Sequence, residues 1–273
     1  SIPKARLGIL QLLLDRGANV HARSSLKMSP LILAAWYGHV ELVKALLDKG
    51  AAIDASIPGG GTALSTAMGQ GQRDVALLLL DRGASVSIET RTGMTPLAYA
   101  ATANDAIVVK AILQRGAKAN RADKAGMTAL MRGSMRNADA ALIALLEGGA
   151  DPNMRNTEGF TALMLAAMNN ASKSATVLMD RGAEINARDT RNQATALIYA
   201  IGMKRWEMAE LLIGKGANPD LADKDGRTPL MLATVEGQEH LVRMLLEAKA
   251  DPTAKDGKGM TARDWAERKG RSN

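Results

Sequence analysis

The stretch Gly226-Arg227-Thr228-Pro229-Leu230-Met231-Leu232-Ala233 returns in degenerate copies along the chain, and it has the features of a turn that leads into a helix. Gly226 suits a tight turn that needs a positive φ, Thr228 can accept a hydrogen bond from a free amide of the first helical turn, and Pro229 stands where a missing N–H costs nothing. Leu230 and Ala233 are three residues apart and share one helix face. We therefore predict an array of copies of this unit.

Two separate markers define the period. A Gly-Ala pair that ends a helix begins at Gly17, Gly50, Gly83, Gly116, Gly149, Gly182 and Gly216, with Lys249 in the same place. The turn-to-helix residue is Ser29, Thr62, Thr95, Thr128, Thr161, Thr195, Thr228 or Thr261. In both series the residue number increases by 33 from one repeat to the next, apart from one step of 34, which is the step from Gly182 to Gly216 and from Thr161 to Thr195. The shared irregular step shows that both markers follow one repeat.

Each unit is predicted to contain two short helices. In the second unit these are residues 30–37 and 40–49, separated by Gly38, and the apolar residues of the second helix follow an amphipathic spacing. Such a unit cannot bury its apolar faces alone, so neighbouring units must stack into an elongated solenoid.

This pattern resembles the ankyrin-repeat family, with the consensus D-x-x-G-x-T-P-L-H-x-A-A-x-x-G-H followed by a Leu-rich helix and Gly-Ala. The match is closest at Asp223, Gly226, Thr228, Pro229, Leu230 and Ala233, and at Ser29, Pro30, Leu31, Ala34, Ala35, Gly38 and His39. The resemblance implies an all-α solenoid of stacked helix-turn-helix units with β-hairpin loops, with about eight to nine repeats. The motif histidine is absent from every copy, and we expect apolar packing to replace its hydrogen bonding.

We predict a single ankyrin-repeat domain over residues 1–273, with a partial first repeat at 1–21, seven full repeats at 22–254 and a polar C-terminal capping repeat at 255–273. In the truncated first repeat, the apolar side chains should be less covered than elsewhere: Leu7, Ile9, Leu10, Leu13 and Leu14. We expect a distorted or longer loop at residues 189–194, which contain one extra residue and have Gln193 in place of the turn glycine. The glycine-rich turn at residues 57–61 should need outside support.

Composition argues against several classes of function. The chain contains no cysteine, and its three histidines, His21, His39 and His240, stand at different repeat positions. We find no catalytic or metal-binding motif, so we predict a protein that is not an enzyme and has no cofactor or metal. No apolar run approaches the length needed to span a bilayer, and the stretch Ser1-Ile2-Pro3-Lys4 does not have the features expected of a signal peptide. The sequence favours a cytoplasmic monomer, with a secreted or periplasmic location left open.

The positions between the repeated markers are the candidates for recognition. Before each motif Ser or Thr stand Met28, Gly61, Met94, Met127, Phe160, Ala194, Arg227 and Met260. The last turns of the first helices contribute, in register, Trp36 and Tyr37, Gly69 and Gln70, Thr102 and Ala103, Met135 and Arg136, Met168 and Asn169, Gly202 and Met203, and Val235 and Glu236. In an ankyrin array both sets would line one concave face, which the family uses to bind proteins.

The leading hypothesis is a scaffold that binds an unidentified protein partner on this concave face. The predicted contact residues are Met28, Trp36, Tyr37, Met94, Met127, Arg132, Arg136, Phe160 and Arg227. Aromatic residues carry much of the binding energy of interfaces, and methionine surfaces adapt to partners. The alternative for the methionines is that they cover neighbouring hairpins, and the alternative for Trp36 and Tyr37 is packing against the first repeat.

A second hypothesis is nucleic-acid or polyanion binding by the later repeats. The net charge is +7 and the pI is near 9.7. The basic residues are Lys124, Arg132, Arg136, Arg191, Lys204, Arg205, Lys224, Arg227 and Lys258. Few aromatic residues accompany them, so base stacking would be weak. We rank nucleic acid well behind a protein partner.

Overall fold

Pairs of short helices make up the computed structural model, which describes residue 9 and residues 12–270. Within these residues, seven helix pairs precede a last helix, α16 (Ala262–Gly270). The first helices of the pairs are α2 (Pro30–Trp36), α4 (Ala63–Gly69), α6 (Pro96–Thr102), α8 (Ala129–Ser134), α10 (Ala162–Met168), α12 (Ala196–Gly202) and α14 (Pro229–Val235). The second helices are α3 (Val40–Asp48), α5 (Arg73–Asp81), α7 (Ala106–Gln114), α9 (Asp139–Glu147), α11 (Ser172–Asp180), α13 (Trp206–Gly214) and α15 (Glu239–Glu247).

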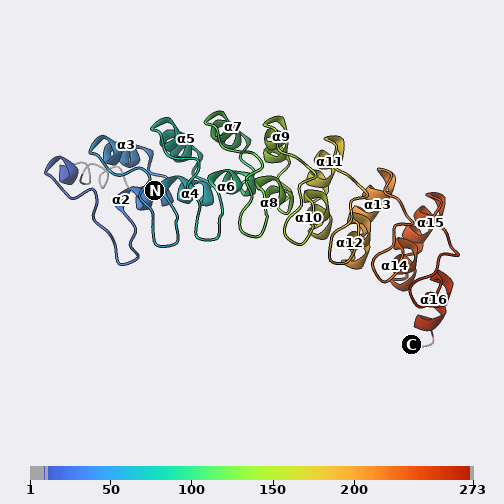
Figure 1. Ribbon diagram of the computed structural model, residues 1–273. Coiled ribbons are helices and arrows are strands. Elements are labelled where there is room, and N and C mark those ends of the chain that lie inside the picture. The colour runs from blue at the N-terminus through green and yellow to red at the C-terminus, as the bar shows by residue number, and fades with distance from the viewer. Residues whose placement is uncertain (1–8, 10–11, 271–273) are drawn as a thin grey trace.

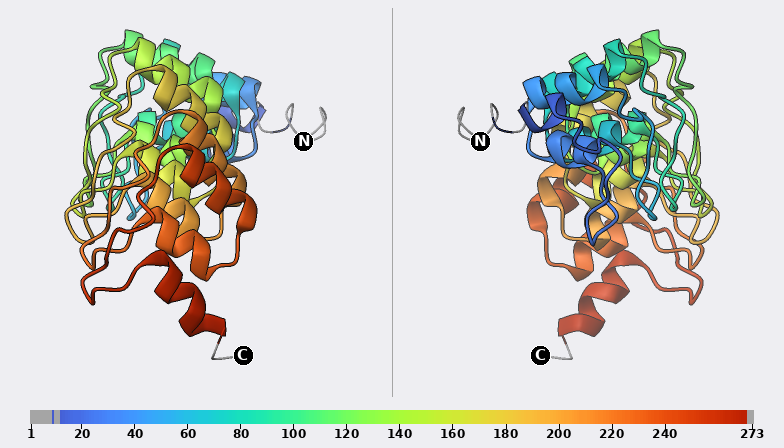
Figure 2. Two further views of the ribbon diagram at one scale, coloured as in Figure 1. Left: turned by 90° about the vertical axis from the view of Figure 1, so that its right-hand side faces the viewer. Right: turned by 90° about the vertical axis from the view of Figure 1, so that its left-hand side faces the viewer.

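The pairs stack side by side into a curved solenoid. Figure 1 shows the second helices along the outer edge of the arc and the first helices on its inner side. Each first helix packs against the first helices of the neighbouring repeats, and the second helices pack on one another in the same way from α3 to α11 and again between α13 and α15. The loops between repeats project together to one side, as Figure 2 shows. We call these loops the fingers; each runs from the end of a second helix to the start of the next first helix.

The predicted threonine caps are present at the first helices. Six threonines, at positions 62, 95, 128, 161, 195 and 228, have extended backbone and accept a hydrogen bond from the amide three residues later. Each such cap is worth about 1 kcal/mol of stability. In the place of the motif histidine, Ile32, Met131 and Met231 are at most 1% exposed, so apolar packing replaces the histidine in these repeats. Ser65 and Asp264 stand in the same place and instead accept a hydrogen bond from the N–H of Thr62 and of Thr261.

Glycines in the left-handed region end the second helices and turn the chain into the next finger. Gly116 and Gly149 have φ of 84° and 86°. Lys249, in the same place of the last pair, is forced to φ 66°. Lys204, between α12 and α13, has φ 58°. L-residues other than glycine and asparagine rarely adopt this conformation, so both lysines carry backbone strain.

The ends of the second helices are joined by ion pairs between repeats. Arg115 pairs with Asp81 of the preceding repeat at 2.6 Å, and Lys215 pairs with Asp180 at 2.8 Å. All four side chains are about a third or more exposed to solvent. Exposed ion pairs contribute about 0–1 kcal/mol each. The buried Leu, Ala and Met side chains between the helices, rather than these ion pairs, hold the stack together.

The fingers close as tight turns. Among residues 12–270 there is no extended strand, and one isolated antiparallel bridge joins Ala122 to Thr128. The glycine-rich finger has support from the next repeat, because the backbone N–H of Arg91 donates to the carbonyl of Gly59 at 2.9 Å and its guanidinium donates to that of Pro58 at 3.1 Å. The finger with the extra residue is longer, because the N–H of Asp189 donates to the carbonyl of Ala194, five residues on, whereas Asp223 donates to Arg227, four residues on. Gln193, at φ 53°, has the left-handed conformation that Gly226 has in the equivalent place.

The two ends of the described chain differ in polarity. Ile9 and Leu13 are 58% and 51% exposed, as predicted for this segment. Leu14 is better covered than predicted, because it is half-buried and packs against the core, and Leu7 and Leu10 lie outside the described residues. At the other end, α16 exposes charged side chains, which agrees with the predicted polar cap. The indole N–H of Trp265 in α16 donates to the buried carboxylate of Asp256 at 3.0 Å and fixes the helix to its finger.

Candidate protein-binding surface

Five of the predicted contact residues occupy the same position at the finger tips. The carbonyl of Met127 accepts a hydrogen bond from the N–H of Asp123, and that of Arg227 accepts one from Asp223, each at 3.0 Å. Met28, Met94 and Phe160 close their turns in the same way. The four apolar side chains of this set are half-buried and pack against the core. They therefore pack on the core with one part of their surface and leave another part to solvent.

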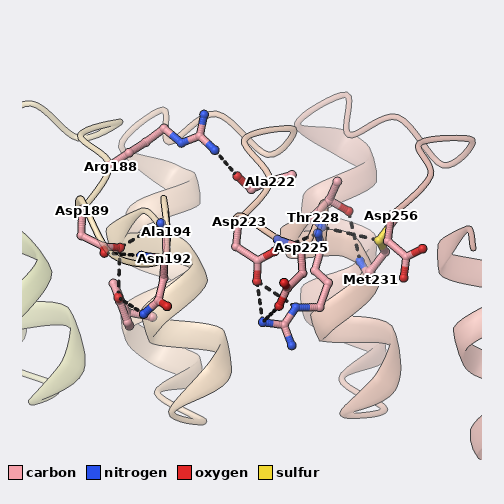
Figure 3. A network of polar contacts seen from close by, with 12 residues as sticks. Arg188, Asp189, Asn192, Ala194, Ala222, Asp223, Asp225, Thr228, Met231 and Asp256 are labelled. Atoms are coloured by element: carbon pink, nitrogen blue, oxygen red, sulfur yellow. Dashed lines mark hydrogen bonds and ion pairs between the residues drawn. The ribbon is translucent and has the colours of Figure 1, made fainter. Parts of the chain in front are cut away.

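Buried aspartates shape the tips. Oδ1 of Asp189 accepts the N–H groups of Arg191 and Asn192, both at 2.7 Å, and Oδ2 accepts the N–H of Ala194 at 2.9 Å and the hydroxyl of Tyr199 at 3.0 Å. Burial alone would raise the pKa of Asp189, but these hydrogen bonds outweigh it and keep the pKa below its ordinary value. Figure 3 shows Asp189 and Asp223 in equivalent places of neighbouring fingers. The carboxylates hold the turns in one conformation.

Two of the predicted charge partners are engaged by these aspartates. The guanidinium of Arg132 is ion-paired with the buried carboxylate of Asp123. Arg227 contacts Asp223 at 2.7 Å and Asp225 at 3.2 Å. Both arginines are still about a third exposed. Arg136 differs, because its side chain is exposed and has no ion pair within the described part of the chain.

Phe160 lies against an aromatic ring of the next repeat. The centroids of Phe160 and Tyr199 are 5.4 Å apart, with an angle of 59° between the ring planes. This tilted arrangement is favourable for aromatic pairs. Since Tyr199 also donates to Asp189, Phe160 is joined through it to the turn of the following finger.

On the inner side of the solenoid, exposed apolar side chains lie at the last turns of several first helices. Trp36 is 44% exposed and Tyr37 64%, while Met135 and Met203, at equivalent positions of later repeats, are 37% and 44% exposed. We call these four residues the inner apolar row. The sequence placed Met135 and Met203 in this register but gave no reason to rank them above the methionines of the tips. The signal that separates them is exposure, which depends on packing.

Local contacts hold Trp36 and Tyr37, the first two residues of the inner apolar row, in place. The ring of Tyr37 stacks on that of His39, with centroids 6.0 Å apart. Burial lowers the pKa of His39, so this imidazole is neutral at pH 7. The amide of Gln72, in the next repeat, donates to the carbonyl of Trp36 at 3.4 Å. The backbone that presents the two aromatic rings is therefore held by both repeats.

Several of the basic residues of the later repeats are paired with carboxylates. Besides Arg132 and Arg227, Lys204 contacts Glu236 at 2.7 Å and Arg191 contacts Glu158 at 3.5 Å. These pairs leave fewer free cations for a phosphate backbone. Within residues 12–270 no group of three His, Cys, Asp or Glu residues is placed to hold a metal ion. No helix in the same part of the chain is long and apolar enough to cross a membrane.

Stacked helix pairs with projecting fingers and an exposed inner row define a helical-repeat solenoid of the kind that binds other macromolecules along one face. The chain belongs to the ankyrin-repeat family: the profile described as ankyrin repeats (3 copies) matches overlapping segments at 4–90, 85–156, 104–189, 131–223 and 163–256. Ankyrin repeats generally mediate protein–protein interactions.

The similar proteins agree with this assignment. The ankyrin repeat domain of Bcl-3, described as a unique member of the IkappaB protein family, superimposes with a TM-score of 0.66 and 25% identity over 88% of this chain and 97% of that chain. Protein glp-1 of Caenorhabditis elegans is 42% identical over 73 residues, which are 27% of this chain and 6% of that protein. Rabankyrin-5 of Homo sapiens is 42% identical over 57 residues, 20% of this chain and 5% of that protein. The matched segments thus cover a small part of these two relatives.

Proposed function

We propose that this chain is a non-catalytic scaffold that binds a partner protein on its concave face, with the inner apolar row as the centre of the contact. The exposure of Trp36 and Tyr37 on neighbouring positions of one helix end carries this proposal. Large apolar side chains exposed in register on one face mark interaction sites, and tryptophan and tyrosine are the residues most enriched among interface hot spots.

The tips extend the same surface. The half-buried Met28, Met94 and Met127 offer adaptable apolar contacts beside the row, and Arg136 offers a free guanidinium. Arg132 and Arg227 can contribute charge only at the edge of the surface, since Asp123 and Asp223 hold them. The inner apolar row should therefore supply most of the binding energy, and the finger tips, where many of the residues predicted from the sequence lie, should supply less.

The test is a photo-crosslinking amino acid at position 37, followed by mass spectrometry of the captured protein and a direct affinity measurement. Replacing Trp36 and Tyr37 together by alanine should weaken binding of the captured partner at least about tenfold, as expected for loss of hot-spot residues. The helical circular dichroism of the variant should be unchanged, because both side chains are exposed.

The matched control lies on the opposite side of the solenoid. Ile107 in α7 and Leu246 in α15 are 54% and 44% exposed, so they resemble the inner row in exposure but belong to second helices. Their double alanine variant should bind the partner as the parent does. Equal weakening by both double variants, or none by the Trp36 and Tyr37 pair, would show that the partner does not use the inner row.

A further inference from the structure

Side-chain bridges between neighbouring repeats recur at the base of the fingers. The carboxamide of Asn120 donates to the carbonyl of Gly149 at 3.2 Å and accepts from the N–H of Asp151 at 2.8 Å. Asn153 repeats both contacts one unit later, with Gly182 at 3.1 Å and Glu184 at 2.8 Å. The accepting half of the bridge is also made by Asp54, Asn186 and Asp220.

Ser87 interrupts this series. It stands in the register of Asn120 and Asn153, but its short side chain interacts with the hydroxyl of Ser85 at 3.0 Å and does not reach the next repeat. The two backbone groups that it would bridge are the carbonyl of Gly116 and the N–H of Lys118. Within residues 12–270 neither group has a hydrogen-bond partner in the protein.

A cleft of about 300 Å³ lies at this interruption. Its lining includes Ser87, Gly116 and Lys118, together with the apolar side chains of Val86 and Leu97. The other interruption of the series, at His21, also borders a cleft, of about 130 Å³. Clefts therefore occur at both places where the bridging side chain is neither Asn nor Asp.

We propose that the cleft at Ser87 binds a primary carboxamide attached to an apolar body. The neighbouring repeats show the chemistry, because a carboxamide occupies the equivalent place at Asn120 and Asn153 and uses both of its hydrogen-bonding ends. Gly116 supplies the acceptor for its N–H, and Lys118 supplies the donor for its oxygen. The apolar body would contact Val86 and Leu97.

A carboxylate fits the cleft less well. It could accept from the N–H of Lys118, but it has no proton to donate to the carbonyl of Gly116, and its charge would face that carbonyl oxygen. The ion pair between Arg121 and Glu89, at 2.7 Å, flanks the cleft and is already neutralised. The structure thus favours a neutral amide. Two sources offer this group: a free small amide, or an Asn or Gln side chain of a bound polypeptide.

The test is an NMR titration of the isotope-labelled full chain with benzamide. We expect saturable shifts centred on the amides of Lys118 and Gly116. N,N-dimethylbenzamide cannot donate to Gly116, and it should bind about tenfold more weakly, the effect of losing one hydrogen bond. Equal shifts with both compounds, or benzamide shifts centred elsewhere, would overturn the proposal.

Three substitutions separate binding from folding. Ser87→Asn should complete the bridge from within the chain, raise the thermal midpoint and abolish the benzamide shifts at Lys118. Ser87→Ala leaves the cleft open and should bind as the parent does. Asn153→Ser should create a second benzamide site, with new shifts at Glu184. A Ser87→Asn chain that is stabilised but still binds benzamide at Lys118 would refute the assignment.

A further titration, with two peptides, distinguishes a free small amide from an Asn or Gln side chain of a bound polypeptide. Acetyl-Gly-Asn-Gly-N-methylamide and its Asp counterpart differ only in the carboxamide. If the group comes from a polypeptide, the Asn peptide binds more tightly than benzamide and the Asp peptide does not. If it comes from a free small amide, benzamide binds more tightly than either peptide. The cleft at Ser87 is separate from the inner apolar row. The results of the benzamide and peptide titrations therefore do not depend on whether Trp36 and Tyr37 bind a partner protein.

Discussion

The ring of Phe160 packs on that of Tyr199, 5.4 Å away in the next repeat, and so joins two fingers through their aromatic side chains. Replacing Phe160 by alanine should lower the free energy of unfolding by about 2 kcal/mol, because a half-buried ring and its aromatic contact are lost. Urea unfolding followed by circular dichroism measures this. Phe160→Leu should keep most of the stability. An alanine variant as stable as the parent, but with weaker partner binding, would show instead that Phe160 is a contact residue.

Acid should weaken the finger that contains Asp189. The hydrogen bonds to this carboxylate keep its folded-state pKa below the ordinary value of 3.8, so the stabilisation is complete above that value and is lost as the pH falls through the folded-state pKa. Asp189→Asn should cost about 1–3 kcal/mol at pH 7, because an amide nitrogen cannot accept the N–H groups that Asp189 accepts. The variant should also lose less stability than the parent as the pH falls below 3.8, measured by thermal unfolding. The same acid-dependent loss in parent and variant would contradict this role.

Lys249 offers a stabilising substitution. It has a φ of 66° in the place where the other repeats have glycine, and a left-handed residue other than glycine costs roughly 1–2 kcal/mol. Lys249→Gly should therefore raise the thermal midpoint by a few degrees. The reciprocal control is Gly149→Ala, at φ 86°, which should lower it. If both variants melt at the parent temperature, the backbone at these positions is not strained.

Polyanion binding should be weak. The excess charge is +7, and pairs such as Lys204 with Glu236 neutralise part of the basic surface of the later repeats. On a heparin column the chain should elute below about 0.15 M salt, the physiological range. Glu236→Gln frees one lysine and should delay elution. Retention well above physiological salt, with a steep salt dependence, would instead favour the nucleic-acid hypothesis.

The sequence predicted the repeat, the paired helices and the threonine caps because these depend on residues close together in the chain, such as Thr228 and the amide three residues later. It could not rank the contact residues, since their exposure depends on neighbouring repeats. Phe160 is half-buried because Tyr199 lies beside it, and Arg132 is engaged because folding brings it to Asp123. Nothing in the sequence analysis singled out Ser87, because the bridges that Asn120 and Asn153 make between repeats depend on the folded structure.

The missing bridge at Ser87 also bears on how the chain folds. Repeats contact only their neighbours, so folding can nucleate in any strong block and spread along the array. Asn120, Asn153 and Asn186 bridge consecutive repeats, so we expect these repeats to form such a block and growth toward the first helices to slow at the junction between Ser87 and Lys118, where the bridge is missing. Hydrogen exchange should accordingly divide the solenoid into two cooperative units at this junction, with the slower exchange on the side of Asn120.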